Sequence, residues 1–189
     1  MLQLSLEDLG AGVARAAGGV GPPPVERWNP PLSGDIDIRI ARDGTWYHEG
    51  VAIPRLALVQ LFAGLLTREG DDYFLVTPVE KWRIQVEDAP FVLVVLDARI
   101  DDRGQQQLVF FTNLGDPVIA GPEHPLRVAV DERTGQPAPY LRVRRNLEGL
   151  LSRPVYYQLA ELAEPTPKGE GVTSTGHGVT SDGMFFPLG

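Results

Sequence analysis

The chain has 189 residues, a net charge of -8 and no cysteine, and these properties already narrow its possible functions. An acidic protein is poorly suited to the phosphate backbone of nucleic acids, so we expect no nucleic acid partner. Disulfides, thiolate metal sites and cysteine nucleophiles are excluded. Hydrophobic residues make up 43% of the sequence, which is enough for one large domain or two small ones.

The N-terminal extension, residues 1–27, does not resemble a targeting sequence. It lacks the basic start and long apolar run of a signal peptide, and no other window approaches the roughly 18 apolar residues of a membrane span. Ser5 and Asp8 resemble a capping box, and the apolar residues that follow recur at helical spacing, which predicts a short helix over residues 6–16. We therefore expect a cytoplasmic protein without a membrane span.

Residues 28–90 are predicted to form a β-rich lobe with one helix. The segment DIDIRI, residues 35–40, alternates isoleucine with charged residues, which predicts a half-buried strand. Asp43 and Gly44 are typical of a hairpin turn, so the segment TWYHEGVAI is predicted as the returning strand. Leucines at helical spacing predict a helix over residues 54–68. Two further strands, DYFLVT and KWRIQVED, complete the lobe.

Residues 91–164 are predicted to form a second β-rich lobe. FVLVVLDARI and QLVFFTN are apolar runs rich in Val and Phe, which predict two strands joined by DDRG. LRVAVD and PYLRV predict another hairpin, NLEGLLSRP predicts a short helix ended by Pro154, and VYYQLAEL predicts a last strand. Residues 165–189 are rich in Pro, Gly, Ser and Thr, so we expect an irregular tail whose last residues, MFFPL, dock on the body.

The two lobes share a short sequence match. GLLTR occupies residues 64–68 and GLLSR occupies residues 149–153. Both matches are predicted to lie in a helix that follows a strand, a turn and a second strand, and that precedes a further strand. A glycine inside a helix costs about 1 kcal/mol relative to alanine, so the two glycines suggest close approach to a sheet. The pattern predicts a duplicated α+β fold, although units of this composition also resemble one another by default.

Several blocks of sequence carry a more specific resemblance. WNPPLSGDIDIRIARDGTW, LVTPVEK, VEDAPF, FTNLGD, HPLRV and PYLRVRRNLEGLLSR occur in the order found in the bacterial family called domain of unknown function 1285. Over residues 28–163 the chain resembles that family. The resemblance implies two duplicated β-rich halves, a C-terminal half loosely similar to a pleckstrin-homology fold, a binding site where the halves meet, and a role in signal transduction. The N-terminal helix and the extended tail depart from the family.

Motifs of known enzymes are missing. The sequence contains no HExxH, no G-x-S-x-G elbow, no Walker loop and no G-x-G-x-x-G placed between a strand and a helix. His48, His124 and His177 lie far apart along the chain, which gives a histidine-based metal site little support. We therefore favour a protein without enzymatic activity and expect no cofactor.

Two carboxylates keep an enzymatic alternative open. Asp35 and Asp37 are two residues apart on a predicted strand, so both project from the same face and are placed to share a divalent cation. With Glu87 or Asp88 as a further ligand they would suit a metal-assisted hydrolase. The simpler interpretation is a solvated strand face on which Arg39 offsets part of the charge.

The favoured site is an anion-binding cleft between the lobes. Arginine side chains suit phosphate and carboxylate groups, and the only concentrated basic stretch precedes the second predicted helix. Clefts between lobes are common ligand sites. The candidate residues are Arg127, Arg142, Arg144, Arg145, Lys81, Glu87, Asp88 and Trp28. The alternatives are ordinary surface ion pairs for the charged residues and a packing anchor for Trp28.

These observations predict a two-lobed binding or signalling module that recognises a small anionic ligand or a protein segment at the interlobe cleft. A structural adaptor that pairs exposed strand edges with a partner is a third possibility, beside the hydrolase. The sequence leaves the identity of the ligand and the oligomeric state open.

Overall fold

The computed structural model describes residues 23–132, 134–166 and 176–188. The chain divides into two compact units between Asp88 and Ala89, which are described separately below as the N-terminal lobe and the C-terminal lobe. The helix predicted over residues 6–16 lies outside the described residues. In the described part of the chain no helix is both long and apolar enough to cross a membrane.

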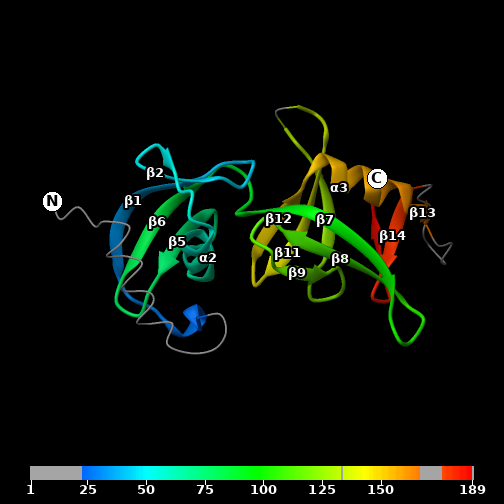
Figure 1. Ribbon diagram of the computed structural model, residues 1–189, viewed down its shortest axis with the longest axis horizontal. Coiled ribbons are helices and arrows are strands. Elements are labelled where there is room, and N and C mark those ends of the chain that lie inside the picture. The colour runs from blue at the N-terminus through cyan, green and yellow to red at the C-terminus, as the bar shows by residue number, and fades with distance from the viewer. Residues whose placement is uncertain (1–22, 133, 167–175, 189) are drawn as a thin grey trace. The chain divides into compact units, whose positions relative to one another are not determined.

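The N-terminal lobe is a six-stranded sheet with one α-helix packed against it (Figure 1). The strands lie in the order β3-β2-β1-β6-β5-β4, and every neighbouring pair is antiparallel except β1 and β6, which are parallel. The elements are the 3-10 helix η1 (Val25–Arg27), β1 (Leu32–Ile40), β2 (Trp46–His48), β3 (Val51–Ala52), α2 (Leu56–Gly64), β4 (Leu66–Glu69), β5 (Asp72–Val76) and β6 (Lys81–Val86).

The core of this lobe follows the predicted alternation of β1. Ile38 and Ile40 are fully buried, whereas the charged residues between and before them keep contact with solvent. Trp46 of β2 stacks on Phe62 of α2 with ring centroids 6.4 Å apart, which ties the helix to the sheet. The predicted hairpin turn is confirmed, because Gly44 has a φ of 86° that few other residues adopt at low cost.

The helix of this lobe is shorter than its periodicity predicts. It ends at Gly64, and residues 66–69 form β4, which pairs with β5. Leu66 continues the helical spacing of leucines, but it also lies opposite Leu75 in the β4–β5 ladder and is fully buried there. The prediction that Arg68 lies in the last helical turn is therefore wrong, because pairing with β5 overrides local helical periodicity.

The C-terminal lobe contains a second six-stranded sheet, one helix and a small third sheet. The large sheet has the order β10-β11-β12-β7-β8-β9, with β12 and β7 parallel, and the small sheet has the order β13-β14-β15. The elements are β7 (Phe91–Ile100), β8 (Gln106–Thr112), β9 (Pro117–Ile119), β10 (Leu126–Val130), β11 (Pro137–Arg144), β12 (Leu147–Leu151), α3 (Arg153–Glu161), β13 (Glu164–Pro165), β14 (His177–Ser181) and β15 (Met184–Pro187).

The two large sheets share one topology. If the strands of each lobe are numbered from one to six, both sheets have the order three-two-one-six-five-four, and in both the first and sixth strands form the parallel pair. The expectation of a duplicated α+β fold of two β-rich lobes is confirmed. The helices break the symmetry, since α2 lies between the third and fourth strands of its lobe and α3 follows the sixth strand of the other.

The match between GLLTR and GLLSR does not mark equivalent positions. GLLTR runs from the end of α2 into β4, whereas GLLSR lies in β12 and the first residue of α3. The prediction of a helix over NLEGLLSRP is wrong, as is the prediction of a strand over VYYQLAEL. Pro154 lies in the first turn of α3, where it lacks no needed hydrogen bond, and Val155 and Leu159 are buried one turn apart.

Gly149 has a packing role, although in a strand rather than in a helix. A Cβ atom built on this residue would overlap the side chain of Leu93 and would lie 3.1 Å from the side chain of Val143. A larger residue would fit here only if the side chains of Leu93 and Val143 shifted. The prediction that both glycines let a helix approach a sheet is wrong, because Gly149 lies in a strand of the sheet itself and a Cβ on Gly64 would lie 3.3 Å from the side chain of Pro23.

The end of the chain is attached to the C-terminal lobe. β14 and β15 form a hairpin that buries Val179 and Phe186. Ser181 is fully buried, and its Oγ accepts from the N–H of Leu108 at 2.9 Å and donates to the carbonyl of Ala120 at 2.7 Å. Residues 177–187 are therefore not the irregular tail that their composition predicts.

The likeness of the C-terminal lobe to a pleckstrin-homology fold stays a prediction.

Candidate functional site

The candidate residues of the N-terminal lobe that follow β6 are held in ion pairs. The carboxylate of Glu87 accepts from the guanidinium of Arg39 and from the backbone N–H of Arg42, the latter at 3.0 Å. Asp88 lies 3.2 Å from Nε of Arg42. The hydrogen bond from the N–H of Arg42 is the main reason why the pKa of Glu87 lies below its usual range. These acids therefore fasten the β1–β2 turn to the end of β6.

Lys81 is also engaged. Its Nζ lies 2.6 Å from Oε1 of Glu69 and 4.4 Å from the centre of the Phe74 ring. Trp28 is half-buried at the end of η1, and its backbone N–H donates to the carbonyl of Val25. Lys81 and Trp28 thus belong to separate local arrangements within this lobe.

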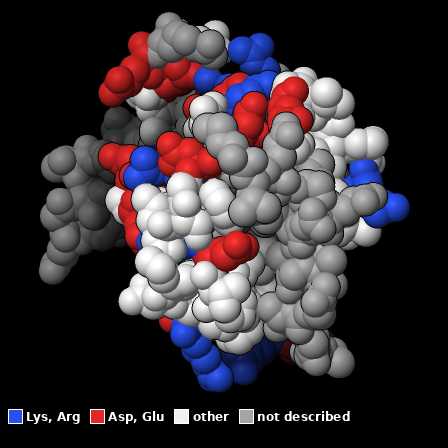
Figure 2. Space-filling view, turned by 90° about the vertical axis from the view of Figure 1, so that its left-hand side faces the viewer, with Lys and Arg blue, Asp and Glu red and all other residues white. Residues whose placement is uncertain are grey.

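Asp35 and Asp37 lie on a mixed-charge face of the sheet. Asp35 is 3.8 Å from Arg83, which is also 3.7 Å from Asp72. Figure 2 views this lobe from the side of β1 and shows basic side chains beside acidic ones. Among the residues that the structure describes, no group of three or more His, Asp or Glu side chains is arranged to hold a metal ion. The described residues therefore give the predicted Asp35 and Asp37 metal site no support.

The candidate arginines all lie in the C-terminal lobe, but they differ in their partners. Arg127 forms a two-pronged ion pair with Glu148, with Nε to Oε1 at 2.7 Å and Nη2 to Oε2 at 2.6 Å, and it stacks over the ring of Tyr140. Arg142 is exposed and lies opposite Glu148 in the β11–β12 ladder. Glu148 therefore neutralises Arg127 and lies beside Arg142, whereas Arg144 and Arg145 lie further along, at the end of β11 and in the connection that follows it.

Arg144 is the last residue of β11 and is held half-buried against the start of β7. Its guanidinium lies 5.0 Å from the centre of the Phe91 ring, within range of a cation–π interaction. Burial lowers the pKa of Arg144, the carboxylate of Asp116 acts in the opposite direction, and repulsion by Arg145 lowers the pKa further. Arginine stays protonated at neutral pH, so a lowered pKa means that the positive charge is held at a cost in free energy.

Arg145 and Asn146 form the two-residue connection between β11 and β12, and together with Arg144 we call them the arginine turn. Arg145 has a φ of 51°, in the left-handed region that glycine and asparagine favour. Such a conformation costs a residue with a Cβ about 1 kcal/mol or more. The turn therefore places Arg145, whose backbone is strained, next in sequence to Arg144, whose guanidinium is partly desolvated.

Hydrogen bonds order the β8–β9 turn, whose Asp116 acts electrostatically on Arg144. The β8–β9 turn that carries Asp116 is closed by Thr112, whose Oγ1 accepts from the N–H of Asp116 at 3.0 Å. Asn113 fastens the same turn to β7, because its N–H donates to the carbonyl of Val92 and its Oδ1 accepts from the N–H of Val92. The structure thus holds Asp116 and the Phe91 ring in place around Arg144.

Sequence reasoning identified the arginines but missed Phe91, Asn113 and Asp116. The segment FFTNLGD has the composition of a tight turn, which does not reveal that Asn113 bonds to Val92 of a different strand. The candidate residues Lys81, Glu87, Asp88 and Trp28 belong to the N-terminal lobe, and the arginines belong to the C-terminal lobe. The three histidines lie on β2, on the β9–β10 connection and on β14. That the candidates of the two lobes form one cleft stays a prediction.

Comparisons with known proteins agree with the resemblance found in the sequence. Residues 23–89 match the family model described as domain of unknown function (DUF1285), N-terminal domain, and residues 90–188 match the model described as protein of unknown function (DUF1285), C-terminal domain. No curated protein matches the sequence.

Two solved structures are similar to the whole chain or to much of it. A DUF1285 family protein from Silicibacter pomeroyi DSS-3 is 47% identical, with a TM-score of 0.84, over 97% of this chain and 94% of the other. A DUF1285 family protein from Shewanella baltica OS155 is 31% identical, with a TM-score of 0.51, over 66% of this chain and 90% of the other.

Proposed function

The chain belongs to the DUF1285 family, and we propose, from the geometry of its own C-terminal lobe, that it is a binding module that recognises a small anionic ligand at the arginine turn. The observation that carries the proposal is the pair of guanidinium groups of Arg144 and Arg145, of which the first is half-buried and repelled by the second. A bound phosphate or carboxylate group would offset both costs.

The electrostatic argument rests on the groups that act on Arg144. The carboxylate of Asp116 attracts its charge, while burial and Arg145 oppose it. Hydrogen bonds between a guanidinium and an anion are among the strongest in proteins, and partial burial makes them less sensitive to screening by salt. An anion that contacts both guanidiniums would therefore offset the burial of Arg144 and its repulsion by Arg145 at the same time.

The backbone of the turn supports the same conclusion. Glycine would adopt the φ of 51° at position 145 at lower cost than arginine. Strain of this kind is found preferentially where a side chain is positioned for binding or catalysis. The cation–π contact with Phe91 and the clamped β8–β9 turn limit the movement of Arg144, which reduces the entropy lost when a ligand binds.

The proposal is tested by isothermal titration calorimetry of the full chain with inorganic phosphate, followed by sugar phosphates, nucleotides and dicarboxylates. The informative variant is Arg145→Gly, because it removes one guanidinium and also relieves the strained φ, so the fold should be retained. We expect it to weaken anion binding by about tenfold or more, since a charge-assisted hydrogen bond contributes about 1.5–3 kcal/mol.

Arg103→Ala is the matched control, since it removes an exposed arginine from the β7–β8 turn of the same lobe. It should leave anion binding within about twofold of the unsubstituted protein. Absence of binding to every anion, or equal affinity of Arg145→Gly and the unsubstituted protein, would contradict the proposal. Binding of acidic peptides together with indifference to small anions would favour recognition of a protein segment instead.

A further inference from the structure

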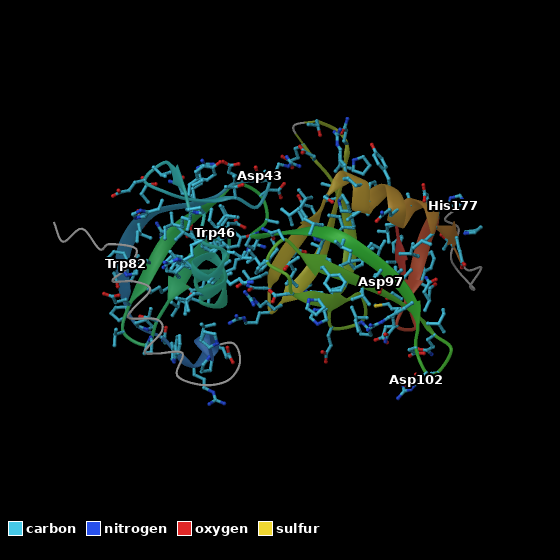
Figure 3. All side chains as sticks on the ribbon, in the orientation of Figure 1. Asp43, Trp46, Trp82, Asp97, Asp102 and His177 are labelled. Carbon is cyan, nitrogen blue, oxygen red and sulfur yellow. The ribbon has the colours of Figure 1, made fainter. Side chains whose placement is uncertain are left out.

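The distal halves of β7 and β8 form a two-stranded arm. Along β7 the residues from Asp97 to Ile100 are all exposed, on both faces of the strand, and the side chain of Ile100 is 65% exposed. The turn at the tip is well ordered, because Oδ1 of Asp101 accepts from the N–H groups of Arg103 and Gln105. In Figure 1 the arm extends past the sheet of its lobe, and Figure 3 labels Asp97 on β7 and Asp102 at the tip.

The β14–β15 hairpin covers one edge of this arm, and α3 also contacts β7. The outer edge of β8 meets the β14–β15 hairpin, where the N–H of Asp182 donates to the carbonyl of Gln106 at 2.9 Å and Nε2 of Gln106 donates to the carbonyl of Thr180 at 2.7 Å. β12 pairs with β7 only from Phe91 to Leu93. Beyond Leu93 no strand within the described residues pairs with β7 on the side opposite β8. Over the exposed residues Asp97 to Ile100, the outer edge of β7 therefore presents backbone groups that a further strand could pair with.

The sequence along this edge is complementary to itself. In LDARI, residues 96–100, the acidic Asp97 and the basic Arg99 flank Ala98 symmetrically, with Leu96 and Ile100 outside them. When two identical strands pair antiparallel about a twofold axis at Ala98, Asp97 of each copy lies opposite Arg99 of the other, and Leu96 lies opposite Ile100. Within the described part of the chain neither Asp97 nor Arg99 forms an ion pair.

We propose that the outer edge of β7 is a homodimer interface, at which residues 96–100 of two copies pair as antiparallel strands centred on Ala98. Charge selects this register. A twofold axis at Asp97 would place two aspartates opposite each other, and an axis at Arg99 would place two arginines opposite each other, and both arrangements are repulsive. The interface is independent of the arginine turn, which lies at the other end of the lobe's strands, where β7 begins and β11 ends.

Analytical ultracentrifugation of the full chain from micromolar to near-millimolar concentrations tests the interface. We expect a reversible dimer in the unsubstituted protein. Asp97→Arg places arginine opposite arginine twice per dimer, and Arg99→Asp places aspartate opposite aspartate twice. Each change should raise the dimer Kd by about tenfold or more. The double variant, Asp97→Arg with Arg99→Asp, restores both opposite-charge pairs and should return the Kd to within about threefold of its original value.

Asp102→Arg is the control for net charge, because it makes the same substitution at the tip of the arm, outside the paired residues. It should leave the dimer Kd nearly unchanged. A monomer at every concentration would overturn the proposal, as would single variants that dimerise like the unsubstituted protein. Single variants that weaken the dimer without recovery in the double variant would also overturn it, because the specific pairs would then be absent.

A crosslinking experiment tests the position of the twofold axis directly. The chain has no cysteine, so Ala98→Cys creates a single thiol. Residues directly opposite in antiparallel strands have Cβ atoms about 4.5–5.5 Å apart, close to the separation that a disulfide spans. Under mild oxidation Ala98→Cys should form a covalent dimer at least about tenfold faster than Ala57→Cys, which places a thiol at an exposed position of α2. Equal rates would overturn the register.

Discussion

Replacement of Ser181 by alanine tests how firmly the end of the chain is attached to the C-terminal lobe. The Ser181 hydroxyl is fully buried and bridges the N–H of Leu108 on β8 and the carbonyl of Ala120 after β9. Alanine would leave both backbone groups without this partner. Leaving a buried polar group unsatisfied costs about 1–3 kcal/mol, so the loss of two such bonds should lower the free energy of unfolding by about 2–4 kcal/mol.

The assay is urea denaturation followed by circular dichroism, together with limited proteolysis that reports local opening of the β14–β15 hairpin. Thr180→Ala is the matched control, because it deletes a hydroxyl from the neighbouring residue. The backbone carbonyl of Thr180, which accepts from Gln106, is retained in this variant. The control should change stability by less than about 0.5 kcal/mol. A loss below about 0.5 kcal/mol for Ser181→Ala, with unchanged proteolysis, would refute the reasoning.

Two further predictions concern packing and pH. Gly149→Ala should destabilise the protein by about 1–3 kcal/mol in the same denaturation assay, because the new methyl group would overlap Leu93; a loss below about 0.3 kcal/mol would contradict this. Hydrogen bonds from Thr45 lower the pKa of Asp43, so near pH 4 the native state binds fewer protons than the unfolded state. The ionised Asp43 therefore stabilises the native state above the unfolded pKa, and this contribution is lost as the pH falls through the folded pKa. Asp43→Ala should therefore flatten the acid limb of stability against pH, and an unchanged limb would contradict the assignment.

The strands of the N-terminal lobe could be predicted because their burial alternates. Ile38 and Ile40 are buried and the charged residues beside them are not, so a period of two is visible in the sequence. The end of α2 could not be predicted in the same way, since Leu66 satisfies both a helical period and the β4–β5 ladder. Pairing with Leu75 of β5, which lies several residues further along the chain, decides between helix and strand at Leu66.

Residues 147–162 show how a short sequence match can lead to a wrong prediction of secondary structure. Leu147, Gly149 and Leu151 are buried and alternate with less buried residues, which is the pattern of a strand. The likeness to GLLTR favoured a helix instead. The following segment contains Val155 and Leu159 one turn apart, and its β-branched and aromatic residues concealed that spacing. The short match therefore misled the prediction for both β12 and α3.

The candidate site was predictable in part. The cluster of Arg142, Arg144 and Arg145 is visible in the sequence, but the register of β11 and β12 determines that Glu148 lies beside Arg127 and Arg142 rather than beside the turn. Phe91 and Asp116 come from β7 and from the β8–β9 turn, so their approach to Arg144 depends on the order of the strands in the sheet. No local pattern carries that information.

The most direct measurement of the central claim is an NMR titration of the isotopically labelled full chain with inorganic phosphate. Saturable shifts should concentrate on the backbone amides of the arginine turn and the β8–β9 turn, and on the side-chain Nε–H of Arg144, while amides of the β7–β8 arm stay unchanged. Shifts that are absent, that grow without saturation, or that concentrate on Arg127 or on the N-terminal lobe would contradict an anion site at the arginine turn.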